Sequence, residues 1–151
     1  MNSTGTVAIK YGLIVSGLLI AFFLILKIFG LHNNPWFRLF NGVITAFGIY
    51  SAIKDYKKNN SDAFDYTNGF KTGLMTGFLA TFIFAIFMGI YMFHLDVAFM
   101  DHLLKDWFHD YNHGGGILIF IILIEGLAST AVLTLTFMQI FKNSGNSPQK
   151  K

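Results

Sequence analysis

An uncharged segment of 22 residues, from Thr72 to Phe93, most restricts what this chain can fold into. A helix of this length crosses a hydrocarbon core of about 30 Å, so the segment predicts a membrane span. Small side chains recur at every fourth residue and form a groove in which a neighbouring backbone can approach closely. The groove consists of Gly69, Gly73, Gly77, Thr81, Ala85 and Gly89. We expect this span to be the central helix of a small bundle, with a slowly winding groove that can serve more than one partner.

Composition also indicates a membrane protein. Hydrophobic residues make up 54% of the 151 residues, charged residues only 13%, and 18 residues are Phe, which lies outside the range of soluble domains. The absence of Cys excludes disulfides, thiolate metal ligands and a cysteine nucleophile. We expect a single domain over residues 1–142 and a disordered cytoplasmic tail over residues 143–151, where polar and small residues dominate.

Three further apolar segments bring the predicted number of spans to four. They cover residues 11–31, 36–53 and 117–141, and the third span in chain order is residues 72–93. The second span is short, and we expect Arg38 near its start to extend outward to the aqueous phase. The sequence therefore predicts an all-α membrane protein, built as a bundle of four transmembrane helices.

The connection between the third and fourth spans has the periodicity of a short amphipathic helix. Asp96 is a candidate N-cap, and the glycines at 114–116 would end the helix. We expect this extracytoplasmic helix to lie at the membrane surface or to cap the bundle from outside. Its predicted apolar face consists of Met100, Leu103, Leu104, Trp107, Phe108 and Tyr111.

The lysines predict the orientation of the chain. One side of the predicted membrane carries Lys10, Lys54, Lys57, Lys58, Lys71, Lys142, Lys150 and Lys151. The other side carries only Arg38 and Lys105, with Lys27 near the boundary. Because loops rich in lysine and arginine stay in the cytoplasm, we expect a multi-pass protein with both termini cytoplasmic.

The histidines suggest a metal site on the outer helix. Spacings of i, i+4, i+7 and i+11 place four potential ligands on one helical face, namely His102, Asp106, His109 and His113. Imidazole and carboxylate groups suit zinc, iron, nickel or copper. One straight helix offers only two or three convergent ligands, so the alternatives are a solvated polar face without metal or a pH-responsive surface.

Glu125 is the candidate for chemistry inside the membrane. It lies about nine residues from the outer end of the fourth span, where an ionised acid costs a few kcal/mol, so it should face the bundle interior and be paired or protonated. Ser129 shares its face, and Lys27 is the intramembrane cation, nearer the surface than Glu125. One interpretation is a proton or cation site, and the other is a hydrogen-bonded packing residue.

We expect no enzymatic activity and no cofactor. The sequence has no phosphate-binding glycine loop, no His-Glu-x-x-His and no serine-nucleophile context. The leading hypothesis is a non-enzymatic accessory or scaffold protein that acts by helix–helix association. The alternatives are a small transporter or proton-linked carrier centred on Glu125 and an extracytoplasmic metal-binding protein. Expected partners are the lipid bilayer and other membrane subunits or a second copy; the lysines are too sparse for nucleic acid.

Several short motifs resemble those of a known family. They are Tyr11-Gly12-Leu13, Gly69-Phe70-Lys71-Thr72-Gly73-Leu74, and Leu95-Asp96 with Phe99-Met100-Asp101 and Leu103-Leu104. With them the chain resembles the bacterial four-span membrane protein family of unknown function numbered four-one-nine-nine. The chain departs from that family at Val97, where proline is expected, and in its short, histidine-rich outer loop. The resemblance implies the four-span topology and the bacterial cytoplasmic (inner) membrane, and it transfers no catalytic residues because the family has no established activity.

Overall fold

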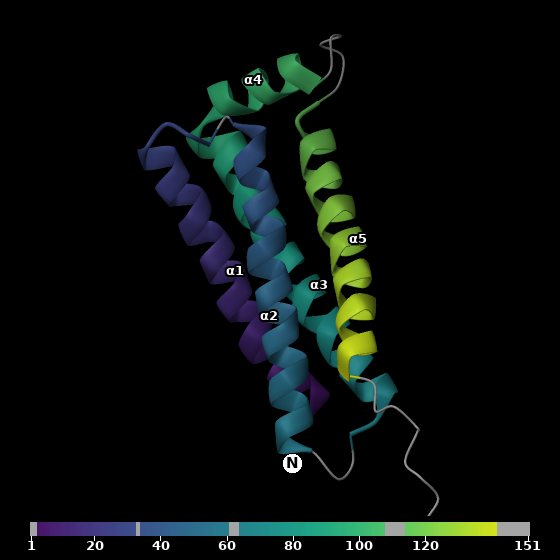
Figure 1. The fold of residues 1–151 in the computed structure, drawn as a ribbon. Helices are drawn as coiled ribbons and strands as arrows, with labels where there is room; N and C mark the ends of the chain where they lie inside the picture. The colour runs from purple at the N-terminus through teal and green to yellow at the C-terminus, as the bar shows by residue number, and fades with distance from the viewer. Residues whose placement is uncertain (1–2, 33, 61–63, 108–113, 142–151) are drawn as a thin grey trace, which may run out of the picture.

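The structure, a computed structural model, describes residues 3–32, 34–60, 64–107 and 114–141, and it is helical without strands over these residues (Figure 1). The predicted all-α class is therefore confirmed. Four helices are long: α1 (Thr4–Ile28), α2 (Arg38–Asn59), α3 (Tyr66–Ile90) and α5 (Gly116–Phe141). Three elements are short: the 3₁₀ turn η1 (Pro35–Phe37), the π-helical turn η3 (Tyr91–Leu95) and α4 (Val97–Trp107).

Three helical segments are long and apolar enough to cross a membrane, which supports a membrane protein. They are α1, α3 continued by η3, and α5. Among the described helices, α2 has the length of a span but not the composition, because its last two turns carry Lys54, Asp55, Lys57 and Lys58. A fourth crossing therefore stays a prediction.

α3 lies at the centre of the packing, as its sequence predicts. Ten of its described residues are buried, against seven in α1, five in α2 and four in α5. It contacts all three of the other long helices (Figure 1). Thr72 and Thr76 are fully buried on α3, and each donates its hydroxyl proton to a carbonyl oxygen one turn earlier, at 2.8 and 2.7 Å. These polar side chains therefore enter the core with their hydrogen bonds made.

The small-residue groove of α3 packs against α5. A Cβ atom at Gly73 would lie 2.6 Å from Cγ2 of Thr134, and one at Gly77 would collide with Thr130. The threonine side chains of α5 thus occupy the space that the glycines of α3 leave open. This lets the two backbones approach closely, as glycine permits in membrane helices.

The same antiparallel register continues beyond these two pairs. Met138 of α5 lies over Gly69, and Thr81 of α3 fills the space over Gly126 of α5. Each step of four residues along α3 is matched by a step of four back along α5. From the sequence, we expect the groove to be able to serve more than one partner. In the structure, one helix of the same chain, α5, occupies it along most of its length.

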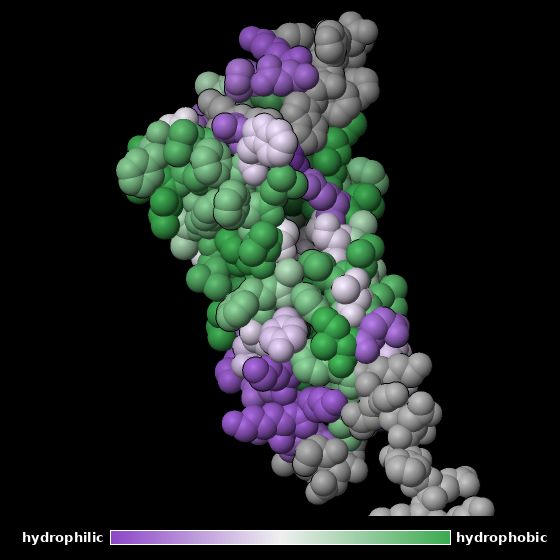
Figure 2. Space-filling view, viewed as in Figure 1, coloured by the Kyte–Doolittle hydropathy of each residue, from purple (hydrophilic) through white to green (hydrophobic). Residues whose placement is uncertain are grey.

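The two ends of the molecule differ in chemistry. The first, here called the lysine end, is where α1 and α3 begin and α2 and α5 end; it carries Lys10, Lys54, Lys57, Lys58 and Lys71 (Figures 1 and 2). α4 crosses the other end, called the α4 end (Figure 1). There Phe99 and Leu104 are buried, whereas Asp101 and His102 are exposed. Phe108 and Tyr111 of the predicted apolar face, and the predicted tail 143–151, lie outside the described residues.

The glycine–threonine packing yields a stability prediction. Replacing Gly77 with Ala should destabilise the fold by about 1–3 kcal/mol, because the new methyl group overpacks against Thr130. Gly17→Ala is the matched control, since a Cβ atom at Gly17 meets no atom within 4 Å. The measurement is thermal or SDS-induced unfolding followed by circular dichroism. Equal stability of the two variants would contradict the close approach of α3 and α5, and Thr130→Ala should partly rescue Gly77→Ala.

Candidate functional site

The intramembrane acid predicted from the sequence, Glu125, forms an ion pair with Arg38. Nη2 of Arg38 donates to Oε2 of Glu125 at 2.6 Å and joins the start of α2 to the third turn of α5. The expectation that Arg38 extends outward is therefore wrong. The physical reason is that a carboxylate within reach accepts a short, charge-assisted hydrogen bond, which is among the strongest that a side chain can make. The pair meets the expectation that Glu125 is paired. The expectation that Glu125 faces the bundle interior is met only in part, because its side chain lines the cavity but is 55% exposed.

Lys27, the cation considered for Glu125, pairs with another acid. Its Nζ lies 3.0 Å from Oδ2 of Asp96 and 4.4 Å from the centroid of the Tyr91 ring. Tyr91 donates its hydroxyl proton to the same carboxylate oxygen at 2.8 Å. The other oxygen, Oδ1, accepts from the backbone N–H of Phe99 at 3.0 Å, so Asp96 caps α4 as predicted. This cluster ties the end of α1 to the junction between η3 and α4.

Arg38 and Glu125 line a cavity of about 430 Å³ at the α4 end. This volume lies within the usual range of small-molecule sites. All four long helices and α4 contribute to its walls, and its apolar lining includes Leu19, Phe23, Phe84, Met88, Phe99 and Ile122. The side chains of Arg38 and Glu125 are 32% and 55% exposed, so the pair lies where the cavity reaches the protein surface. Figure 2 shows hydrophilic residues between α2 and the half of α5 nearer to α4, with apolar residues around them.

Polar residues on two helices face this cavity. On α2 they are Arg38, Asn41 and Thr45, spaced i, i+3 and i+7; on α5 they are Glu125 and Ser129, spaced i, i+4. Oδ1 of Asn41 is buried and has no hydrogen-bond partner among the described residues. Sequence reasoning missed Asn41 and Thr45, although their helical spacing from Arg38 in an apolar segment was a readable signal. A buried acceptor without a hydrogen bond is unfavourable, because the loss of its hydration is not compensated.

His32 approaches the cavity from the connection between α1 and η1. Its ring packs against those of Phe99 and Phe23, with centroid distances of 5.0 and 6.3 Å. Within the described part of the chain its Nδ1 is buried without a partner. Burial lowers the pKa of His32 below its ordinary value, so the imidazole is neutral at pH 7. It therefore adds a polar but uncharged group to the lining.

Half of the predicted metal-ligand set lies within the described residues. Nε2 of His102 is 3.4 Å from Oδ2 of Asp106, one turn apart on the exposed side of α4. His109 and His113 lie outside the described residues. The residues that the structure describes contain no group of three or more His, Cys, Asp or Glu placed to hold a metal ion. The metal site stays a prediction.

The cluster around Asp96 yields a prediction for the pH dependence of stability. Hydrogen bonds from Lys27 and Tyr91 lower the pKa of Asp96 from 3.8 to about 2. A carboxyl group whose pKa is lower in the folded than in the unfolded protein stabilises the fold at pH values above its unfolded pKa. This stabilisation is lost as the pH falls towards 2. Asp96→Asn should therefore cost about 1–2 kcal/mol of unfolding free energy near pH 6. The difference from the parent should shrink steadily below pH 4.

The pH prediction is tested by measuring the free energy of unfolding of the parent and of Asp96→Asn in detergent between pH 6 and pH 2. The matched control is Asp65→Asn, because Asp65 precedes α3 without making a side-chain capping bond. A gap between Asp96→Asn and the parent that stays constant down to pH 2 would contradict the ionic origin of the effect.

Comparison with known proteins bears on the identity of the chain. A family described as "Protein of unknown function (DUF4199)" matches residues 10–111, which include Arg38, Lys27 and Asp96 but not Glu125. Comparisons with curated proteins and with solved structures gave no match. The family match covers more than half of the chain and confirms the resemblance seen in the sequence. The chain therefore belongs to the DUF4199 family of proteins of unknown function.

Proposed function

We propose that this chain is a non-enzymatic integral membrane protein that binds an amphipathic small molecule in the cavity at its α4 end. The observation that carries the proposal is the cavity of about 430 Å³, with mainly apolar walls and an Arg38–Glu125 ion pair where it reaches the surface. Ligand sites combine an apolar lining with a few placed polar groups in this way.

The lining also indicates the chemistry of the ligand. An apolar part would pack among aromatic and aliphatic side chains such as Phe23, Phe84 and Met88. A polar part would lie between the facing polar residues of α2 and α5. Because the buried atom without a partner on α2 is the acceptor Oδ1 of Asn41, a hydroxyl or ammonium donor fits better than a second acceptor.

The small-transporter alternative requires a path from this cavity to the other side of the membrane. The deepest polar lining residues are Thr45, Thr81 and Ser129. Beyond them, towards the lysine end, the glycines of α3 are in close contact with the threonines of α5. This packing favours binding from the α4 side, and a transport cycle centred on Glu125 would have to separate α3 from α5.

For the topology, we propose four crossings, with α2 as the second, in the bacterial cytoplasmic (inner) membrane and with the lysine end in the cytoplasm. α2 runs beside α1, α3 and α5 over a length of 22 residues, which supports a crossing. The concentration of lysines at one end supports the orientation through the positive-inside rule. The proposed location in the inner membrane is based on the family resemblance.

The second candidate function is that of an accessory or scaffold subunit. The groove of α3 no longer supports it, because α5 occupies that groove. The remaining support is a face of α1 on which Gly17 and Ala21 are exposed, beside the exposed Leu18 and Ile25. A second helix, from another copy or another membrane subunit, can approach closely at such a face.

A cavity-filling substitution tests the binding proposal. A Cβ atom at Gly42, which lines the cavity, meets no atom within 4 Å, so the side chain of Gly42→Phe starts in open space and is expected to occupy part of the cavity. Gly17→Phe is the control, since Gly17 also faces open space but outside the cavity. The probe is a single-chain amphiphile with a hydroxyl headgroup and a diazirine on its tail, photolysed in native membranes. Labelling of residues 121–129 should fall about tenfold in Gly42→Phe and persist in Gly17→Phe. Equal labelling of both variants would exclude the cavity as the site.

The scaffold candidate has its own test, which benefits from the absence of Cys in the chain. Gly17→Cys introduces a single thiol on the open face of α1. If α1 pairs with a second copy, mild oxidation in membranes should give a disulfide-linked dimer. Leu135→Cys, on the exposed side of α5, should give about tenfold less dimer at the same expression level. Equal crosslinking at the two positions would indicate random collision.

A further inference from the structure

A second pocket, of about 220 Å³, lies between α1 and α2 at the lysine end. Its lining residues on α2 are Ser51, Lys54, Asp55 and Lys58, and α1 contributes Tyr11. The spacing i, i+3, i+4 and i+7 places the four residues of α2 on one helical face. We propose that this pocket binds the phosphate headgroup of an anionic phospholipid from the leaflet at the lysine end.

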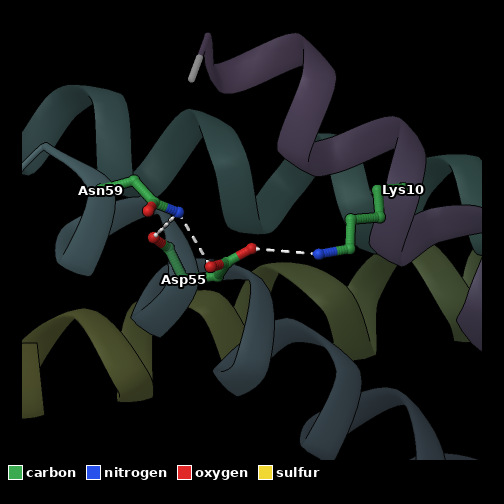
Figure 3. Close-up of polar contacts among 3 residues, drawn as sticks. All are labelled: Lys10, Asp55 and Asn59. Carbon is green, nitrogen blue, oxygen red and sulfur yellow. Dashed lines mark hydrogen bonds and ion pairs between the residues drawn. The ribbon is translucent and has the colours of Figure 1, made fainter. Parts of the chain in front are cut away.

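The one carboxylate in the pocket is already engaged by neighbouring donors. Figure 3 shows Asp55 between Lys10 of α1 and Asn59 of its own helix. Nζ of Lys10 lies 3.4 Å from Oδ2 of Asp55, and Nδ2 of Asn59 donates to Oδ1 at 2.9 Å. With Lys54 and Lys58 added, three lysines face one carboxylate, so the pocket and its rim carry a net charge of +2.

The two lysines that line the pocket are arranged for an anion. Lys54 and Lys58 lie one turn apart on the exposed surface of α2, where like charges repel each other. Neither forms an ion pair with any described residue. A phosphate group between them would remove the repulsion and accept hydrogen bonds from both ammonium groups. The hydroxyl of Ser51 supplies a further donor in the same pocket, whereas the hydroxyl of Tyr11 is hydrogen-bonded to Asp55.

The surface next to the pocket favours a lipid over a free phosphate. On α1, the residues that follow Tyr11 by one and two turns towards the α4 end are Ile14 and Leu18, which are 48% and 49% exposed. On α2, Phe47 lies one turn from Ser51 and is 70% exposed. Acyl chains extending from a headgroup in the pocket would cover these side chains. Basic pockets between helices on the cytoplasmic side of a membrane recognise anionic headgroups in this way.

The test uses the full chain in mixed micelles with equal amounts of phosphatidylglycerol and phosphatidylcholine. Native mass spectrometry reports how much of the protein retains one phosphatidylglycerol molecule. A juxtamembrane lysine contributes about fivefold to such binding, so Lys54→Gln with Lys58→Gln should weaken retention about 25-fold. Ser51→Ala, which removes one hydroxyl from the pocket, should weaken retention about threefold.

The matched control is Lys71→Gln with Lys105→Gln, which removes the same charge at two exposed positions outside the pocket and should leave retention unchanged. Circular dichroism verifies that every variant is folded. If both double variants lose phosphatidylglycerol retention equally, the lysines attract the lipid diffusely and the proposed site is wrong. Displacement of the lipid by millimolar glycerol phosphate would overturn the lipid assignment in favour of a soluble phosphate. The outcome is independent of the cavity at the α4 end, because the two sites share no residue.

Discussion

The close approach of α3 and α5 is the contact on which the rest of the structure depends. Helices inside a bilayer gain little from the hydrophobic effect when they associate, so their packing relies on van der Waals contact at short range. Gly73 and Gly77 provide that contact for the threonines of α5. Nearer the α4 end the contact loosens, since a Cβ atom at Gly89 would meet Ile119 only at an ordinary 3.6 Å. The molecule is therefore closely packed between these helices towards the lysine end, whereas its cavity lies towards the α4 end.

At the α4 end, ion pairs take over part of the role that packing has elsewhere. Lys27 with Asp96 joins α1 to the start of α4, and Arg38 with Glu125 joins α2 to α5. Each pair connects segments far apart in the sequence, and hydrogen bonds between charged groups are stronger than those between neutral groups. The Arg38–Glu125 pair is also part of the cavity lining. A charged or hydrogen-bonding ligand would therefore act on the same contact that holds α2 to α5.

Much of the fold could be read from the sequence, because apolar length and small-residue spacing are local properties. The helix ends were less accurate, since helices extend beyond the membrane: α1 begins at Thr4, where Oγ of Ser3 accepts from the N–H of Thr6 at 3.1 Å. The ion-pair partners could not be predicted. Which carboxylate a long Arg or Lys side chain reaches depends on helix register and tilt, which no single segment encodes. The cavity has the same origin, because its walls combine residues of all four long helices and of α4.

The chemistry of the cavity lining limits which molecules match it. The cavity, of about 430 Å³, reaches the protein surface, so molecules that surround the protein there can enter it. Water alone suits the polar side formed by Arg38, Asn41 and Glu125 but not the ring faces of Phe84 and Phe99. A bulk hydrocarbon chain suits those rings but leaves the Asn41 oxygen without a donor. A molecule with both kinds of surface would match the whole lining, and this match is the physical basis of the proposed amphipathic ligand.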